Sequence, residues 1–452
     1  MSREPEAIVA AALGVLEQVG AVQADAILVA SESIQVRVRG EEVEFVKQSR
    51  ENVLGLRGFI TGDAGLQQAL TSTSDLSPEA VRQVAEKAVE LARATAGDPH
   101  AGLPDAPSTQ ALADLKLHDP ADRPVKVEDR IDAARVAERA ARAVDPRILN
   151  SEGSDAGSQF SNIVYGTSKG FIGSYASATH SLSCEPIAQV GDERQRDYWY
   201  AVSRSLSDLG EPEEIGRIAG ARAIARLGAH PVDTCEVPVI FEQRVAASLL
   251  RQLFQCTSGY AIYRGASFLV DKLGEAIAAP SVTVIDDGTI PAGLGSKPFD
   301  AEGLPTRRNV IVSGGVLENY LLDSYSARKL GAQSTGSAAR GVGSGPSVAP
   351  TNLWLEPGTQ SLEEIVAATD RGLLVTELIG AGFNPVTGDY SHGAAGHWIE
   401  GGARLHPVEE VTIAGNLGAM LCEVDHVGSD LLWLGRIGSP SLRISRMTVA
   451  GR

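Results

Sequence analysis

Apolar residues in the first part of the chain recur with helical spacing, then with strand spacing, then with helical spacing again. Residues 5–19 place their apolar side chains on one helical stripe, which predicts an opening helix. Residues 34–45 alternate apolar and polar side chains around Gly40, as in a hairpin with one solvated face. A third strand is predicted over residues 53–60, and a helix over residues 78–91. Together they predict a compact unit in which helices cover an antiparallel sheet.

A proline-rich stretch follows this unit. Residues 96–124 carry five prolines among small polar residues, which is typical of a surface connection. A helix is predicted over residues 127–144, and the composition changes near Ser151. We therefore expect an N-terminal domain over residues 1–150 and a C-terminal domain over residues 151–452.

The second domain is expected to be mainly β. Short strand-like runs punctuated by glycine follow Ser151, and a helix is predicted over residues 212–227. A strand at residues 237–241 leads directly into a helix over residues 244–256. The predicted fold class is α+β, with an N-terminal α/β domain containing an antiparallel sheet and a C-terminal, mostly β domain with a few helices.

Charge and cysteine usage exclude several functions. The chain has 452 residues and a net charge of −17, and its basic residues form no concentrated patch, so direct nucleic-acid binding is disfavoured. The four cysteines form no CxxC pair and suit a reducing compartment. The chain has no signal-peptide pattern and no long apolar run, so we expect a cytoplasmic protein without membrane contact.

The pair His392 and His397 is the most obvious metal-ligand pattern. A zincin places its two histidines on a helix, with a glutamate directly after the first. Here Gly393 takes that place, among small residues that favour a loop or a strand. We therefore expect no metal site at this pair.

Three other patterns are weaker than they look. Residues 326–329 match the SxxK of serine acyl-enzymes, but the companion SDN and KTG motifs are absent. Residues 341–346 are glycine-rich like a phosphate loop, yet they lack the Lys-Ser/Thr pair, so we expect a mobile loop. Asp286 and Asp287 are adjacent on a predicted strand, face opposite ways and are expected to be solvated surface.

Residues 388–400, with the sequence GDYSHGAAGHWIE, and residues 407–417, PVEEVTIAGNL, strongly resemble the TldD/PmbA family. This family is also known as the modulator of DNA gyrase or peptidase U62 family, and the match is to its PmbA (TldE) branch. Supporting matches lie at residues 71–76, 298–303 and 324–336.

The resemblance implies a two-domain chain in an intertwined dimer. In this family the TldD-type subunit holds zinc with a HExxxH helix and a C-terminal cysteine. The PmbA-type subunit lacks these ligands and completes a shared peptide-binding chamber. The assembly is a cytosolic peptidase that trims unfolded polypeptides and modified peptide precursors, and the gyrase name reflects indirect genetics.

The same resemblance locates a degenerate zinc helix in this chain. The zinc helix should follow the strand at residues 237–241. In that register Arg251 and Gln252 replace the first histidine and the glutamate, and Cys256 stands at the second histidine. Arginine does not ligate metals and glutamine is no general base. Residues 433–438 also lack the expected cysteine, so no cofactor is expected in this chain, and zinc only in a TldD-type partner.

These observations lead to one main hypothesis and two alternatives. The main one is a zinc-free PmbA/TldE-type subunit that pairs with a TldD-type zinc subunit, or with itself in its absence, and helps to hold a peptide at a sheet edge. The alternatives are a self-sufficient homodimeric hydrolase with a metal on His392, His397 or Cys256, and a peptide-binding scaffold without proteolytic activity. The motifs propose these cleft residues: Thr335, Asp389, Tyr390, Ser391 and Asn416.

Overall fold

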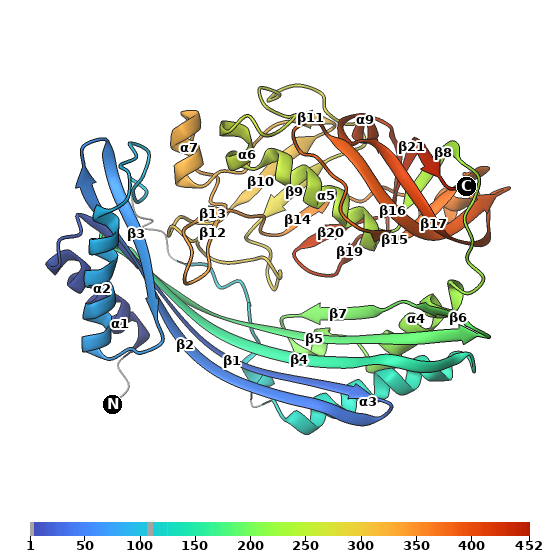
Figure 1. Cartoon of the computed structure of the whole chain (residues 1–452), viewed down its shortest axis with the longest axis horizontal. Helices are drawn as coiled ribbons and strands as arrows, with labels where there is room; N and C mark the ends of the chain where they lie inside the picture. Colours follow the sequence, from blue (N-terminus) through green and yellow to red (C-terminus); the bar gives the residue numbers. More distant parts are fainter. Residues whose placement is uncertain (1–3, 106–111, 124) are drawn as a thin grey trace.

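The computed structural model describes residues 4–105, 112–123 and 125–452. A long, curved sheet lies below a more compact C-terminal part that contains the other sheets (Figure 1). The mixed α and β architecture agrees with the predicted fold class. Among the described residues no helix is long and apolar enough to cross a membrane.

The described part of the chain gives the long sheet seven strands, all paired antiparallel, in the order β3-β2-β1-β4-β5-β6, with β7 also paired to β5. Its strands are β1 (Gln23–Arg39), β2 (Glu42–Gly62), β3 (Gly65–Thr73), β4 (Ile148–Thr167), β5 (Ile172–Val190), β6 (Glu193–Arg196) and β7 (Trp199–Ser203). The predicted turn at Gly40 joins β1 to β2, and Gly40 and Glu41 both have positive φ, as a tight hairpin requires. The strand predicted over residues 53–60 is not separate, because β2 continues without a break from the hairpin turn.

Within the described residues, four helices cover this sheet. They are α1 (Pro5–Gln18), α2 (Pro78–Arg93), α3 (Val127–Ala143) and α4 (Pro212–Ala225), with short 3-10 helices η1 (Pro120–Asp122) and η2 (Leu206–Asp208). Figure 1 shows α1 and α2 at one end of the sheet and α3 and α4 toward the other. The helix α2 starts at the predicted signal, because the Ser77 hydroxyl accepts a hydrogen bond from Ala80 N and Pro78 occupies the first turn.

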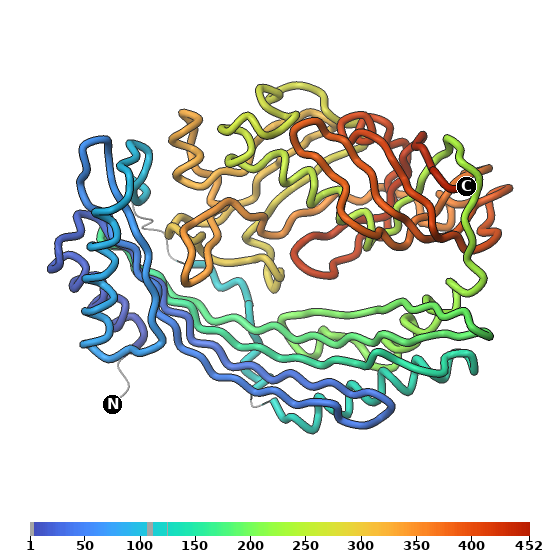
Figure 2. Tube along the Cα trace, viewed as in Figure 1, coloured from blue at the N-terminus to red at the C-terminus, as the bar shows by residue number. Residues whose placement is uncertain are grey.

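The sheet continues across residue 150, where the sequence suggested a domain boundary. β4 begins at Ile148 and pairs with β1 from Asp25 to Val38, so one sheet contains strands from both sides of that position. The chain leaves this part of the molecule only after α4, over residues 226–234. Figure 2 shows this connection rising at the end of the sheet that lies near the C-terminus. Of the proline-rich connection, residues 106–111 and 124 lie outside the described residues.

The C-terminal part contains two six-stranded sheets and a two-stranded ribbon. One sheet has the order β11-β10-β9-β14-β20-β19, the other β17-β16-β15-β8-β21-β18, and β12 pairs with β13. The strands are β8 (Cys235–Phe241), β9 (Val284–Asp287), β10 (Arg308–Ser313), β11 (Val316–Leu317), β12 (Ala338–Ala339), β13 (Ser347–Val348), β14 (Leu353–Leu355), β15 (Arg371–Ile379), β16 (Asp389–Glu400), β17 (Ala403–Asn416), β18 (Val424–Val427), β19 (Leu432–Trp433), β20 (Ile437–Ser439) and β21 (Leu442–Ala450).

The helix α5 (Gln243–Thr257) lies between the two larger sheets. It contacts β14 and β20 of one sheet and β8 and β15 of the other. Its apolar face is buried in the largest hydrophobic core of the molecule, which draws side chains from both sheets. Four shorter helices complete this part: α6 (Gly259–Tyr263), α7 (Ser324–Leu330), α8 (Leu362–Ala367) and α9 (Leu417–Cys422).

Candidate functional site

The helix α5 presents two chemically different faces. β8 ends at Phe241 and α5 begins at Gln243, so the predicted step from strand to helix is present. Gln252 and Cys256 lie four residues apart on the buried face, because that spacing returns to the same side of a helix. Arg251 lies on the exposed face. The three positions assigned to a degenerate zinc helix therefore do not face one common point.

Gln252 faces His392 of β16. The two side-chain nitrogens, Gln252 Nε2 and His392 Nε2, lie 3.2 Å apart, and His392 Nδ1 lies 3.2 Å from Gly380 O. A carbonyl only accepts, so Nδ1 carries the proton and Nε2 accepts from the Gln252 amide. Burial lowers the pKa of His392, which favours this neutral ring. The lone pair that a metal would need is thus engaged by an amide.

Cys256 lies one turn further along α5 and is fully buried. Its thiol contacts Pro385 O at 3.8 Å, and burial raises its pKa to about 12. Zinc needs a thiolate, so this neutral thiol is a poor ligand. One imidazole engaged by an amide and one neutral thiol do not fit the donor set of a zinc site. In the described ranges, no three His, Cys, Asp or Glu side chains come close enough to hold a metal ion.

The exposed face of α5 borders a cavity of about 390 Å³, here called the helix cavity. Arg251, Arg244 and Arg436 line it, together with Leu434 and Gly435 of the C-terminal stretch. Tyr200 of β7 closes it from the long sheet, and its hydroxyl donates to Leu434 O over 2.7 Å. The two stretches that the resemblance links to zinc binding thus meet here, but they supply arginines and apolar groups.

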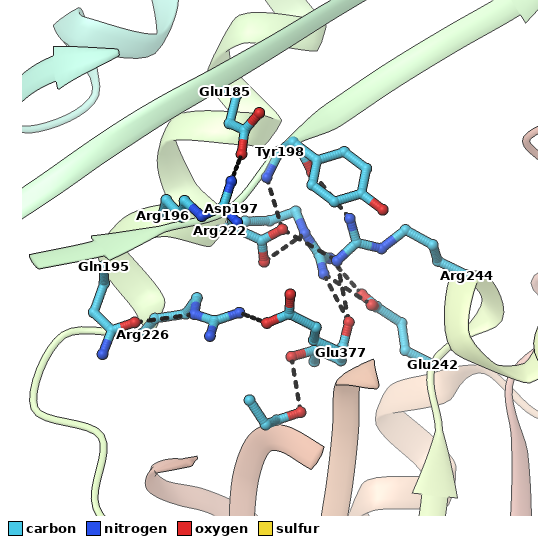
Figure 3. Close-up of polar contacts among 12 residues, drawn as sticks. Glu185, Gln195, Arg196, Asp197, Tyr198, Arg222, Arg226, Glu242, Arg244 and Glu377 are labelled. Atoms are coloured by element: carbon cyan, nitrogen blue, oxygen red, sulfur yellow. Dashed lines mark hydrogen bonds and ion pairs between the residues drawn. The ribbon is translucent and has the colours of Figure 1, made fainter. Parts of the chain in front are cut away.

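Buried ion pairs fix α5 against the long sheet (Figure 3). Arg222 of α4 donates to Glu242, just before α5, over 2.7 Å, and its Nε lies 3.3 Å from Asp197. Arg244 of α5 donates to the other oxygen of Asp197 over 3.1 Å. None of these side chains is more than 14% exposed, so the pairs are weakly screened and hold β7 opposite α5.

The five cleft candidates from the sequence do not form one site. Asp389 and Asn416 meet where β16 pairs with β17: Asn416 donates to Asp389 at 3.4 Å and caps α9 through Gly418 N. Ser391 is exposed on β16, whereas Tyr390 is buried beside the His392 ring, with ring centres 4.6 Å apart. The Thr335 hydroxyl bonds with Leu322 and Ser337 in another segment. Asp389, Asn416 and Thr335 thus stabilise turns and caps.

Three models of the PmbA/TldA metallopeptidase match this chain: domain 1 over residues 24–92, the central domain over residues 120–227 and the C-terminal domain over residues 234–451. "Metalloprotease PmbA" of Escherichia coli O157:H7 is 38% identical over 424 residues, which cover 93% of this chain and 90% of that protein. The chain belongs to the PmbA/TldD family.

Solved structures agree with this membership. A Bacteroides thetaiotaomicron protein whose name describes it as a modulator of DNA gyrase superposes with a TM-score of 0.91 at 27% identity, over the whole of both chains. TldE from Thermococcus kodakarensis has a TM-score of 0.88 and covers 98% of this chain and all of its own. At 24% identity, the latter shows a shared fold.

Within this PmbA/TldD-family chain, other polar motifs have structural roles. His397 Nε2 contacts Ala225 O at 3.2 Å, so it lies against α4 and does not share a partner with His392. Ser326 of the SxxK pattern is buried in a capping box with Asp323, while Lys329 lies 3.7 Å from Asp98. Neither pair is arranged for catalysis.

Two expectations from the sequence were wrong. Asp286 is not solvated: it is fully buried and accepts hydrogen bonds from Thr351 N and Oγ1, at 2.7 and 2.9 Å. The glycine-rich residues 341–346 are not a free loop. They dock on β2, where a side chain at Gly55 would overlap Val342 O.

A second cavity, of about 380 Å³, lies between the long sheet and the C-terminal part and shares Pro350 and Arg436 with the helix cavity. We call it the basic cavity, because Arg204, Lys297, Arg340 and Arg436 line it with a single carboxylate, Asp300. None of these residues was proposed as a site residue from the sequence. They are scattered over residues 204–436. Asp300 and Arg436 lie in stretches that the family resemblance singled out, residues 298–303 and 433–438, and Arg340 directly precedes the glycine-rich segment.

Proposed function

We propose that this chain is the zinc-free, PmbA/TldE-type subunit of a TldD/TldE-like metallopeptidase complex that degrades or trims unfolded peptides and peptide precursors. The observation that carries the proposal is the helix cavity, where α5 and the C-terminal stretch meet without a metal-ligating side chain among the residues that line it. Zinc and the general base then come from a TldD-type partner, and the chain forms a homodimer where that partner is absent.

The chemistry of the helix cavity supports this assignment. Arg244, Arg251 and Arg436 line the helix cavity, and guanidinium groups have no lone pair for a metal. Their charges repel a divalent cation. Gln252 cannot take a proton from water as the glutamate of a HExxxH helix does. The name of the E. coli relative, a metalloprotease, supports peptidase chemistry for the assembled complex.

Two sheet edges meet at the helix cavity and suit the binding of an extended peptide. β7 is paired to β5 on one side, and β19 is the terminal strand of its sheet. Tyr200 of β7 and Leu432 of β19 both line the cavity. An extended peptide adds to such edges by main-chain hydrogen bonds, which suits substrates of varied sequence.

Co-purification with a TldD-type partner tests the proposal. The chain is expressed alone and together with the partner, and zinc content and peptide cleavage are measured on both preparations. We expect zinc and chelator-sensitive cleavage only in the paired preparation. Stoichiometric zinc and cleavage by the chain alone would overturn the proposal.

The zinc content of alanine variants distinguishes the proposed subunit from the alternative, a self-sufficient hydrolase. A metal-dependent homodimer that uses His392, His397 or Cys256 should lose its zinc in the corresponding alanine variant, whereas the proposed subunit shows no zinc to lose. A scaffold without proteolytic activity would bind peptide but give no cleavage with any TldD-type partner. All four cysteines are free thiols, which suits a reducing compartment, and we place the complex in the cytoplasm.

A further inference from the structure

The basic cavity differs sharply from the rest of the protein in charge. The chain carries a net charge of −17, yet four basic side chains and one carboxylate line this cavity. The single carboxylate, Asp300, accepts hydrogen bonds from the main-chain nitrogens of Glu302, Leu304 and Ala338. Burial raises its pKa, and the charge of Lys297 and these three hydrogen bonds only partly oppose that effect. The cavity is therefore a local concentration of positive charge in an acidic protein.

Two of these basic groups, Arg204 and Lys297, form direct hydrogen bonds only to neutral groups. Arg204 is buried and donates to the carbonyls of Ala178, Gly293 and Leu294, and to the Thr179 hydroxyl. Lys297 donates to Ala338 O over 2.6 Å. In the described parts of the chain, neither side chain forms an ion pair. Burial lowers the pKa of both groups, and the nearby charge of Asp300 partly opposes this effect for Lys297.

Arg340 gives the most specific indication of a ligand, because two of its buried nitrogens lack a hydrogen-bond partner among the described residues. Its side chain is wholly buried, and its Nη1 donates to Asp25 Oδ1 over 2.5 Å. Its Nε and Nη2 have no hydrogen-bond partner among the described residues, and neither has the hydroxyl of Tyr165, which also lines the cavity. Unpaired buried donors are costly, so their occurrence together at a cavity wall indicates a ligand that accepts hydrogen bonds.

The free edge of Arg340 has a defined chemical preference. Nε and Nη2 form the side of the guanidinium fork that holds a carboxylate by two parallel hydrogen bonds. The same edge binds Asp155 in Arg37, at 2.9 and 3.1 Å, and Asp425 in Arg443, at 3.0 and 2.8 Å. In Arg340, which lines the basic cavity, this edge has no such partner among the described residues.

We propose that the basic cavity binds a carboxylate of the peptide, with Arg340 as the bidentate donor and Lys297, Tyr165 and Arg436 around it. This inference rests on the proposed function, because it assumes that a peptide lies in the cleft. The basic cavity adjoins the helix cavity through Pro350 and Arg436, so a peptide held here by its carboxylate extends along α5 and β7. The carboxylate is either the C-terminal one or that of an acidic side chain.

Three labelled peptides of otherwise neutral sequence test the proposal on the purified full chain. One has a free C-terminal carboxylate, one has a C-terminal amide, and one has the amide together with an internal aspartate. Charge-assisted hydrogen bonds predict that at least one carboxylate peptide binds about tenfold more tightly than the neutral amide, and that salt reduces the difference. Tight binding of the peptide with the free C-terminus identifies the C-terminal carboxylate as the group that is bound. Tight binding of the amidated peptide with the aspartate identifies an acidic side chain.

Variants of residues that line the basic cavity test whether the carboxylate preference depends on that cavity. Arg340→Lys keeps a positive charge near Asp25 but loses the fork, and Arg436→Gln changes an exposed residue, so neither should abolish folding. We expect both to reduce the preference for carboxylate at least fivefold, whereas the exposed control Arg82→Gln on α2 leaves it unchanged. Thermal unfolding verifies that each variant is folded.

Several results would overturn the inference. They are equal affinity for all three peptides, no binding of any of them, an unchanged preference in both variants, or stronger competition by inorganic phosphate than by acetate. None of these results bears on the zinc-free subunit, which is decided by zinc content and cleavage of the co-purified pair.

Discussion

The side-chain amide of Gln252 donates a hydrogen bond to Nε2 of His392 over 3.2 Å, joining α5 to β16 in the interior of the C-terminal part. Both side chains are at most 8% exposed. A position that the family resemblance assigns to a catalytic glutamate thus serves as a structural amide. His392 of the matched motif accepts its hydrogen bond. The zinc-helix position and the motif histidine are therefore partners in a structural contact.

A double-mutant cycle tests this pair. Gln252→Leu leaves the buried His392 Nε2 without a donor and should lower the free energy of unfolding by about 1–3 kcal/mol. Replacing both partners, in Gln252→Leu with His392→Phe, should cost less than the two single changes added together, because no unpaired polar group remains. Urea unfolding of the four proteins measures the coupling. Strictly additive losses would show that the hydrogen bond is unimportant.

Thiol labelling tests the state of Cys256. Because burial raises the pKa of the Cys256 and Cys184 thiols to about 12, neither should react with iodoacetamide in the folded protein at pH 8. The exposed Cys422 should react within minutes and serves as the internal control. Mass spectrometry of tryptic peptides, before and after unfolding in urea, gives the extent of labelling. Rapid labelling of Cys256 in the folded chain would mean that a thiolate is available there for metal.

Local signals explain what the sequence could predict. The caps at Ser77 and Pro78, the turn at Gly40 and the apolar stripe of α5 depend on neighbours within a few residues, and all of them are present. The length of β2 was not predictable, because the strand continues through residues 43–52, where most side chains are exposed and the alternation fades.

Long-range pairing explains what was missed. The boundary suggested near residue 150 lies within a sheet because β1 pairs with β4, more than a hundred residues away. The burial of Asp286 depends on Thr351, and the basic cavity depends on side chains from four distant segments. None of these contacts has a periodic signature along the chain, whereas the long motif around Asp389 and Asn416 identified the family without locating a site.

The burial of Asp286 predicts an unusual pH dependence. Burial raises the pKa of Asp286 from 3.8 to about 6, and the hydrogen bonds from Thr351 only partly oppose this. A carboxyl with a raised folded pKa stabilises the fold below its unfolded pKa, and this contribution is lost as pH rises through about 6. Asp286→Asn should therefore become more stable relative to the natural protein between pH 4 and pH 7, by up to about 3 kcal/mol. Urea unfolding at several pH values checks this, and parallel curves for the two proteins would contradict it.

The ion cluster of Asp25 predicts the largest loss of stability. Burial disfavours its charge, but Arg57 and Arg340 outweigh that effect and hold the pKa of Asp25 below its ordinary value. Asp25→Asn leaves two buried guanidinium groups without a counter-charge, and removal of one partner from such a cluster costs about 3–5 kcal/mol. Because Arg340 belongs to the C-terminal part, the loss should also loosen the contact between that part and the long sheet.

The pair Arg37 and Asp155 provides a matched control for this prediction. It lies on the same sheet and also joins an aspartate to an arginine by two hydrogen bonds, but its side chains are 40% and 28% exposed. Water screens the pair, so Asp155→Asn should cost at most about 1 kcal/mol. Urea unfolding of both variants at pH 7 measures the difference, and hydrogen exchange of residues 341–345 follows the contact with β2. Equal costs would mean that the Asp25 cluster does not join the long sheet to the C-terminal part.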